Sequence, residues 1–71
     1  MEPKDIGAEY VRGVEAGRKT ASTLAEIEPA SEAAAALREE IAFVKREIKR
    51  VGADYYTGPF LVGLRDGLEG A

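Results

Sequence analysis

The chain has 71 residues, of which 10 are basic and 13 are acidic, so its formal net charge is −3. This length is about half that of a typical domain, and we expect one helical domain over residues 1–71. Chains of this size bury only about 60% of the surface that they expose when unfolded, so their thin core usually needs a disulfide, a metal or a second copy. Cysteine and histidine are both absent, which excludes disulfides, zinc fingers, thiol nucleophiles and histidine acid–base pairs.

The sequence does not predict a membrane segment. Its first five residues, Met-Glu-Pro-Lys-Asp, carry acids where an export signal has bases. The longest run without a charge, Tyr55–Leu64, has ten residues, whereas a helix needs about 20 apolar residues to span a bilayer. We therefore expect a cytoplasmic protein with no membrane span.

Two proline-containing breaks divide the chain into three helical segments. Pro29 and Pro59 disfavour helix at the residue that precedes each of them, so both mark boundaries. Between the breaks, apolar residues recur at helical spacing, and no segment alternates with the period of two that is typical of a strand. The sequence therefore predicts an all-α fold with helices over 3–28, 31–56 and 59–69.

The first two predicted helices carry matching apolar seams. The residues of the first seam are Ile6, Tyr10, Gly13, Gly17, Thr20, Leu24 and Ile27. The residues of the second seam are Ala34, Leu37, Ile41, Val44, Ile48, Val51 and Tyr55. Both seams alternate spacings of three and four, as in a coiled coil, and the break between them is short. We therefore predict an antiparallel, coiled-coil-like hairpin.

Small residues in the first helix permit a close helix contact. Gly13, Gly17 and Ala21 lie four residues apart on one face, where they would let Val44 or Ile48 of the second helix approach closely. The alternative is that the glycines only accommodate a bend. Helix propensity alone does not explain them, because each glycine costs about 1 kcal/mol relative to alanine in a helix interior.

The predicted third helix is short and amphipathic. Pro59 suits the first helical turn. The apolar face consists of Phe60, Gly63, Leu64, Gly67 and Leu68. About eleven residues with two internal glycines make a marginal helix in isolation, so this helix must dock on its own hairpin or on another subunit.

The sequence carries no signature of catalysis. It has no P-loop, no dinucleotide glycine fingerprint, no histidine to activate a serine and no cluster of metal ligands. Glu39 and Glu40 are adjacent and point about 100° apart on a helix, which is typical of a solvated face rather than an acid–base pair. We therefore expect a non-catalytic protein with no cofactor and no bound metal.

Apolar residues outside the seams predict contacts with other chains. Val11, Phe43 and Val62 lie where a two-helix hairpin leaves them exposed, unless the third helix covers Phe43. We expect a homo-oligomer and a protein partner, as for an inhibitor, an adaptor or an assembly factor. The residues predicted at the partner or oligomer interface are Tyr10, Gly13, Gly17, Phe43, Tyr56, Phe60, Leu61 and Leu64.

Two further hypotheses concern charged ligands. The turn before the third helix could hold an anionic small molecule such as a nucleotide between subunits. The residues predicted there are Tyr55, Tyr56, Thr57, Gly58 and Arg65. The third-ranked hypothesis is nucleic-acid binding through the basic residues of the second helix, which are Lys45, Arg46, Lys49 and Arg50. It ranks last because these residues barely make their own helix positive in an acidic protein.

Overall fold

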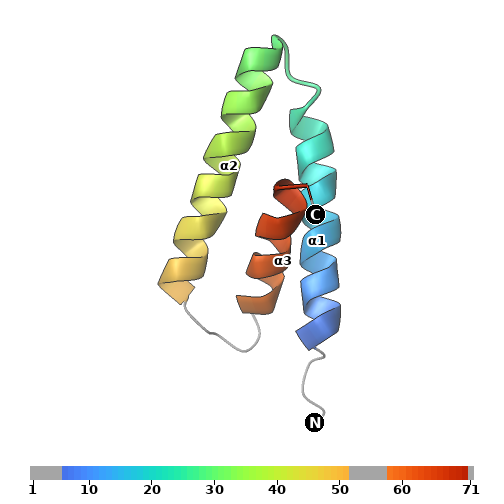
Figure 1. Ribbon diagram of the computed structural model, residues 1–71, viewed down its shortest axis with the longest axis vertical. Helices are drawn as coiled ribbons and strands as arrows, with labels where there is room; N and C mark the ends of the chain where they lie inside the picture. The colour runs from blue at the N-terminus through green and yellow to red at the C-terminus, as the bar shows by residue number, and fades with distance from the viewer. Residues whose placement is uncertain (1–5, 52–57, 71) are drawn as a thin grey trace.

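The computed structural model describes residues 6–51 and 58–70, which form three α-helices (Figure 1). They are α1 (Ile6–Leu24), α2 (Ala30–Val51) and α3 (Gly58–Leu68). No strand occurs in these two ranges, and the predicted all-α class, with a hairpin and a short third helix, is confirmed. Residues 3–5 and 52–56 of the predicted helices lie outside the described ranges.

α1 ends earlier than the sequence predicts, at Leu24. Beyond it, the amides of Glu26 and Ile27 bond to carbonyl oxygens three residues back, at 3.2 and 3.1 Å, so the chain tightens into turns. Pro29 disfavours helical backbone at the residue before it, and its own carbonyl oxygen accepts the amide of Glu32 at 2.9 Å as α2 begins. The predicted first helix therefore extended too far into the break.

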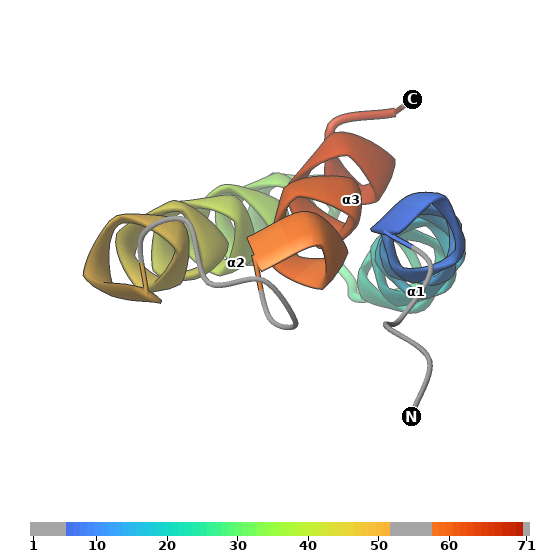
Figure 2. The same cartoon turned by 90° about the horizontal axis from the view of Figure 1, so that it is seen from below.

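α1 and α2 run antiparallel and form the long sides of a molecule that measures 48 × 21 × 16 Å (Figure 1). α3 runs in the same direction as α1 and lies between the two long helices (Figures 1 and 2). It contacts α1 far more extensively than it contacts α2, and α1 and α2 contact each other little. The hairpin is therefore held together mainly through α3.

The contact between α1 and α3 is a contact between backbones. A Cβ atom on Gly13 would overlap the carbonyl oxygen of Phe60, and one on Gly17 would overlap that of Leu64. The Cβ atom on Gly17 would also lie 2.7 Å from the amide nitrogen of Leu68, which is closer than real Cβ contacts allow. Only glycine fits at these two positions of α1.

The contact is reciprocal, because α3 presents two glycines of its own. A Cβ atom on Gly63 would overlap the carbonyl oxygen of Tyr10, and one on Gly67 would overlap that of Val14. Each helix therefore has glycine at the positions where a side chain would separate the two backbones. Small residues spaced by four allow helix backbones to approach closely in this way.

The predicted close approach along the glycines of α1 is confirmed, but the predicted neighbour was wrong. The backbone of α3 lies against Gly13 and Gly17, where the sequence analysis placed Val44 or Ile48 of α2. The physical reason is that α3 lacks side chains at the contact, so it approaches α1 more closely than a helix bearing branched aliphatic residues can.

The core of the described residues is thin. Val44 of α2 is 1% exposed and Leu68 of α3 is 2% exposed, and no other large apolar side chain in this part of the chain is fully buried. The accessible surface of 4934 Å² exceeds the roughly 4,300 Å² expected for a compact chain of 7.6 kDa. The backbone contact between α1 and α3 therefore accounts for a large share of the packing.

We expect Gly17→Ala to lower the free energy of unfolding by about 2 kcal/mol. The methyl group would overlap backbone atoms of α3, which no side-chain rotation relieves, and overpacking of this kind costs about 3 kcal/mol. The gain in helix propensity returns only about 1 kcal/mol. Urea unfolding followed by circular dichroism measures the difference.

The matched control is Gly7→Ala, because Gly7 is exposed on the same helix. This control should leave the free energy of unfolding unchanged or raise it. A Gly17→Ala chain as stable as the Gly7→Ala chain would contradict the backbone contact.

Candidate interaction surface

The most exposed large apolar side chains of the described residues belong to α1 and α2. Val11 is 52% exposed and Phe43 is 51% exposed, as the sequence predicts. Val62, the third residue expected to be exposed, is instead partly buried. The alternative in which the third helix covers Phe43 is wrong, because α3 leaves half of this side chain open to solvent.

Phe43 lies on the opposite side of α2 from the ion pair that α2 makes with α3. Val44 is buried, and Nζ of Lys45 lies 3.4 Å from Oε2 of Glu69, the residue that follows α3. Successive residues are about 100° apart around a helix axis, so Phe43 and Lys45, two positions apart, point in nearly opposite directions. We call the surface made by Phe43 and its helical neighbours the Phe43 face. These neighbours are Ala36, Glu39, Glu40, Arg46, Glu47 and Arg50.

Charge is distributed unevenly along the Phe43 face. Glu39 and Glu40 precede the aromatic ring, whereas Arg46 and Arg50 follow it. Nη2 of Arg50 donates a hydrogen bond to Oε1 of Glu47 at 2.7 Å, and this bond lowers the pKa of Glu47. The face therefore has an apolar centre, an acidic part toward the N-terminus of α2 and a basic part toward its C-terminus.

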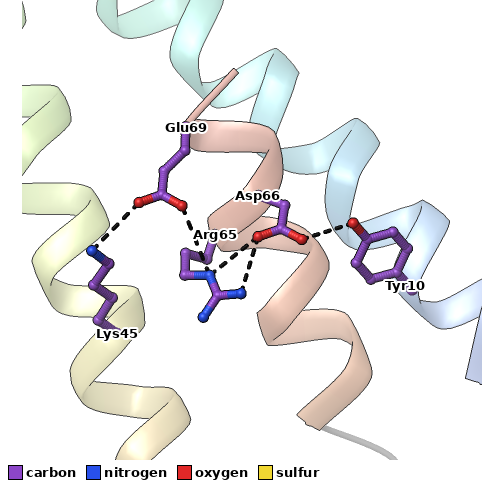
Figure 3. A network of polar contacts seen from close by, with 5 residues as sticks. All are labelled: Tyr10, Lys45, Arg65, Asp66 and Glu69. Atoms are coloured by element: carbon purple, nitrogen blue, oxygen red, sulfur yellow. Dashed lines mark hydrogen bonds and ion pairs between the residues drawn. The ribbon is translucent and has the colours of Figure 1, made fainter. Parts of the chain in front are cut away.

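A chain of polar contacts on the other side of α2 joins all three helices (Figure 3). It continues from the Lys45–Glu69 pair to Arg65, whose Nε lies 3.9 Å from Oε1 of Glu69. Nη2 of Arg65 donates to Oδ1 of Asp66 at 3.1 Å, and the hydroxyl of Tyr10 on α1 donates to Oδ2 of Asp66 at 2.7 Å. These side chains are partly exposed, so each ion pair contributes about 0–1 kcal/mol. Their effect is to fix the position of α3 between α1 and α2.

The hydrogen bond between Tyr10 and Asp66 shifts the pKa of both groups. It stabilises the ionised carboxylate, and it is the main cause that holds the pKa of Asp66 below its ordinary value of 3.8, with a smaller contribution from Arg65. The same bond requires the protonated hydroxyl, and it is the main cause that raises the pKa of Tyr10 above 10.0. The bond is therefore complete only when Asp66 is ionised and Tyr10 is neutral.

An apolar groove of about 300 Å³ lies between α1 and α2 near the connection that joins them. Its lining residues are Ala21, Ala25, Ala30, Ala33, Ala34 and Leu37. None of these six side chains is polar, so the groove supplies neither an acid nor a base. The groove shares no residue with the polar contacts around α3.

The residues predicted at a partner interface differ widely in their accessibility. Gly13 and Gly17 are buried against α3, and the hydroxyl of Tyr10 is bonded to Asp66. Phe43 has the most exposed side chain of the predicted set within the described ranges. The members of the set on α3, all partly buried, are Phe60, Leu61 and Leu64.

The predicted anion site is only partly described. Gly58 is buried at the start of α3, and Arg65 contacts the carboxylates of Asp66 and Glu69, so its charge is already compensated. Three residues of this prediction lie outside the described ranges, namely Tyr55, Tyr56 and Thr57.

The predicted basic patch is partly neutralised within the chain. Lys45 pairs with Glu69, and Arg50 pairs with Glu47. The other two members, Arg46 and Lys49, are exposed to solvent. Internal pairing reduces the positive charge that the patch offers to the phosphates of a nucleic acid.

Sequence reasoning missed the α3 half of the backbone contact. Gly63 and Gly67 have the same spacing of four as Gly13 and Gly17, and this match between two predicted helices was the available signal. Asp66, which fixes Tyr10, had no comparable signal in the sequence.

No protein family, characterised protein or solved structure is significantly similar to the chain. Within 6–51 and 58–70, no helix is long and apolar enough to cross a membrane. In the same ranges, acidic side chains do not gather in groups of three or more that could hold a metal ion.

We expect the Tyr10–Asp66 hydrogen bond to make stability depend on pH at both extremes. The pKa of Asp66 is lower in the folded chain than in the unfolded chain, so the contribution is present above the unfolded value and is lost as pH falls below 3.8 through the folded value. The pKa of Tyr10 is raised, so the contribution is also lost as pH rises above 10.0 through the folded value.

Tyr10→Phe removes the donor and tests this expectation. The parent should be more stable than the variant between these limits, and the difference should shrink at both ends of the pH range. Urea unfolding across the range measures the two profiles. Thr23→Val is a control, because the Thr23 hydroxyl donates only to a carbonyl oxygen of its own helix, that of Lys19 at 3.1 Å. A constant difference between the parent and Tyr10→Phe would contradict the pKa assignments.

Proposed function

We propose that the chain is a non-catalytic helical binding protein that self-associates and acts through contacts with other proteins. The supporting observation is Phe43, a large aromatic side chain that is 51% exposed near the middle of α2. Aromatic side chains surrounded by charged residues are typical of the central anchors of protein interfaces.

The free energy of burying an aromatic side chain favours an interface role for Phe43. Complete burial of an aromatic side chain contributes about 1.5–3 kcal/mol relative to leaving it in water. The core of a chain this short supplies only about 3–5 kcal/mol, so an intermolecular contact at Phe43 is a substantial addition. A second copy or another protein would therefore enlarge a core that contains few buried side chains.

The placement of polar groups supports a non-catalytic role. Enzymes bring titratable side chains together inside a cavity that holds the substrate. Here the groove is lined by six apolar residues, whereas the contacts around Asp66 lie at the surface and join helices to one another. A protein with this arrangement can act as an inhibitor, an adaptor or an assembly factor by covering part of a partner's surface.

We expect Phe43→Ser to abolish the capture of protein partners by the immobilised chain without changing its helix content. The side chain is half exposed, so its removal leaves the described core intact. Quantitative mass spectrometry of the proteins retained from a lysate of the source cells measures capture, and circular dichroism measures helix content.

Arg38→Ser is the matched control, since Arg38 is exposed on α2 outside the Phe43 face. This variant should retain the same proteins as the parent. Equal retention by the parent and by Phe43→Ser would contradict the proposed function.

A further inference from the structure

We propose that α2 pairs in an antiparallel manner with α2 of a second copy, through the Phe43 face, about a two-fold axis that passes beside Phe43. This inference rests on the proposed function, because it specifies the surface and the symmetry of the self-association. A two-fold contact uses the same patch on both copies, so the patch must be complementary to itself.

Every residue of the Phe43 face is exposed or partly exposed to solvent. In Figure 2, α2 forms one edge of the molecule, with α3 and then α1 on its other side. The helix has 22 residues and is about 33 Å long, and Phe43 lies close to its middle. A second helix can therefore lie alongside α2 without meeting α1 or α3.

The charges of α2 select the antiparallel direction. Its first half, residues 30–40, has three carboxylates and one guanidinium, a net charge of −2. Its second half, residues 41–51, has four basic groups and one carboxylate, a net charge of +3. A parallel pair would place like charges side by side, whereas an antiparallel pair places each acidic half against the basic half of the other copy.

The helix dipole does not account for this separation of charge. Its effect is confined to the first and last turns, where it explains the acid at Glu32 and the base at Arg50. Glu39 and Arg46 lie in the middle turns, where the dipole favours neither sign. Their arrangement on either side of Phe43 therefore has another cause, and pairing with a second copy supplies one.

The proposed axis creates specific pairs across the interface. Glu39, four residues before Phe43, and Arg46, three residues after it, lie on the same side of the ring, so each copy's Glu39 lies opposite Arg46 of the other copy, and this pair occurs twice. On the other side of the ring, Glu40 lies opposite Glu47, whose charge Arg50 already compensates. The Phe43 rings of the two copies pack against each other at the axis, and each buries part of the other's surface.

Sedimentation velocity over a dilution series tests the pairing. The parent should approach twice its mass of 7.6 kDa as concentration rises. Phe43→Ser should raise the dimer Kd by at least about 30-fold, as expected for an interface anchor that is removed from both copies. Val11→Ser removes an equally exposed apolar side chain from α1, and it should leave the dimer Kd unchanged.

Charge exchange tests the antiparallel register. Glu39→Arg and Arg46→Glu should each weaken the dimer by about tenfold, because each places like charges opposite one another twice. The double variant re-creates both pairs with the signs exchanged, so its Kd should return to within about threefold of the parent value. Arg38→Glu reverses a charge outside the Phe43 face and should have little effect.

Three results would overturn the proposed pairing. They are a parent chain that stays monomeric at every concentration, a dimer that is insensitive to Phe43→Ser, and a double variant that is no tighter than either single variant. Circular dichroism establishes that each variant is folded. A monomeric parent that still captures other proteins through Phe43 would overturn the pairing and the self-association but leave the proposed binding of other proteins standing, so the two failures are distinguishable.

Discussion

The backbones of α1 and α3 touch where Gly13 and Gly17 meet Gly63 and Gly67. Four glycines in helix interiors cost about 4 kcal/mol of helix propensity, so the contact must return at least that much through packing. Helices at this separation gain dispersion contacts along both backbones, and Cα–H groups can approach carbonyl oxygens of the other helix. The spacing of four residues on both helices also fixes their register and their parallel direction. The short α3, marginal by itself, is a stable element because α1 provides this contact.

The two sides of α2 differ in their contacts because of how α3 is held. The glycine contact sets the rotation of α3 so that Asp66 lies beside Tyr10 and Glu69 lies beside Lys45 (Figure 3). These polar groups are used in holding the three helices together. Phe43 lies on the opposite side of α2, where no helix of the described chain covers it. The groups that hold the three helices together and the exposed ring of Phe43 therefore lie on separate surfaces, which is why we expect that Phe43 can be changed without disturbing the fold.

Local sequence patterns were sufficient to predict the three helices and the exposure of Phe43, because proline breaks and seam positions are local features. The end of α1 at Leu24 was not predictable from the seam, which continues three residues into the turns that follow the helix. The neighbour of the α1 glycines was also missed, because the matching seams of the two long helices favour direct contact and give no weight to a shorter helix between them. The bond between Tyr10 and Asp66 spans 56 residues of sequence, a separation at which periodicity carries no information. Tertiary packing, rather than propensity, decided the neighbour of the glycines and the bond between Tyr10 and Asp66.

The central claim is that α3, and not α2, lies against the glycines of α1. Nuclear Overhauser effects from the Hα protons of Gly17 test it directly. Because glycine has no side chain, these protons can lie close to protons of the neighbouring helix. The structure predicts strong effects between Gly17 and Gly67, whose backbones are in contact. Effects from Gly17 to the methyl groups of Val44 or Ile48, without effects to Gly67, would contradict it and would place the two long helices in direct contact.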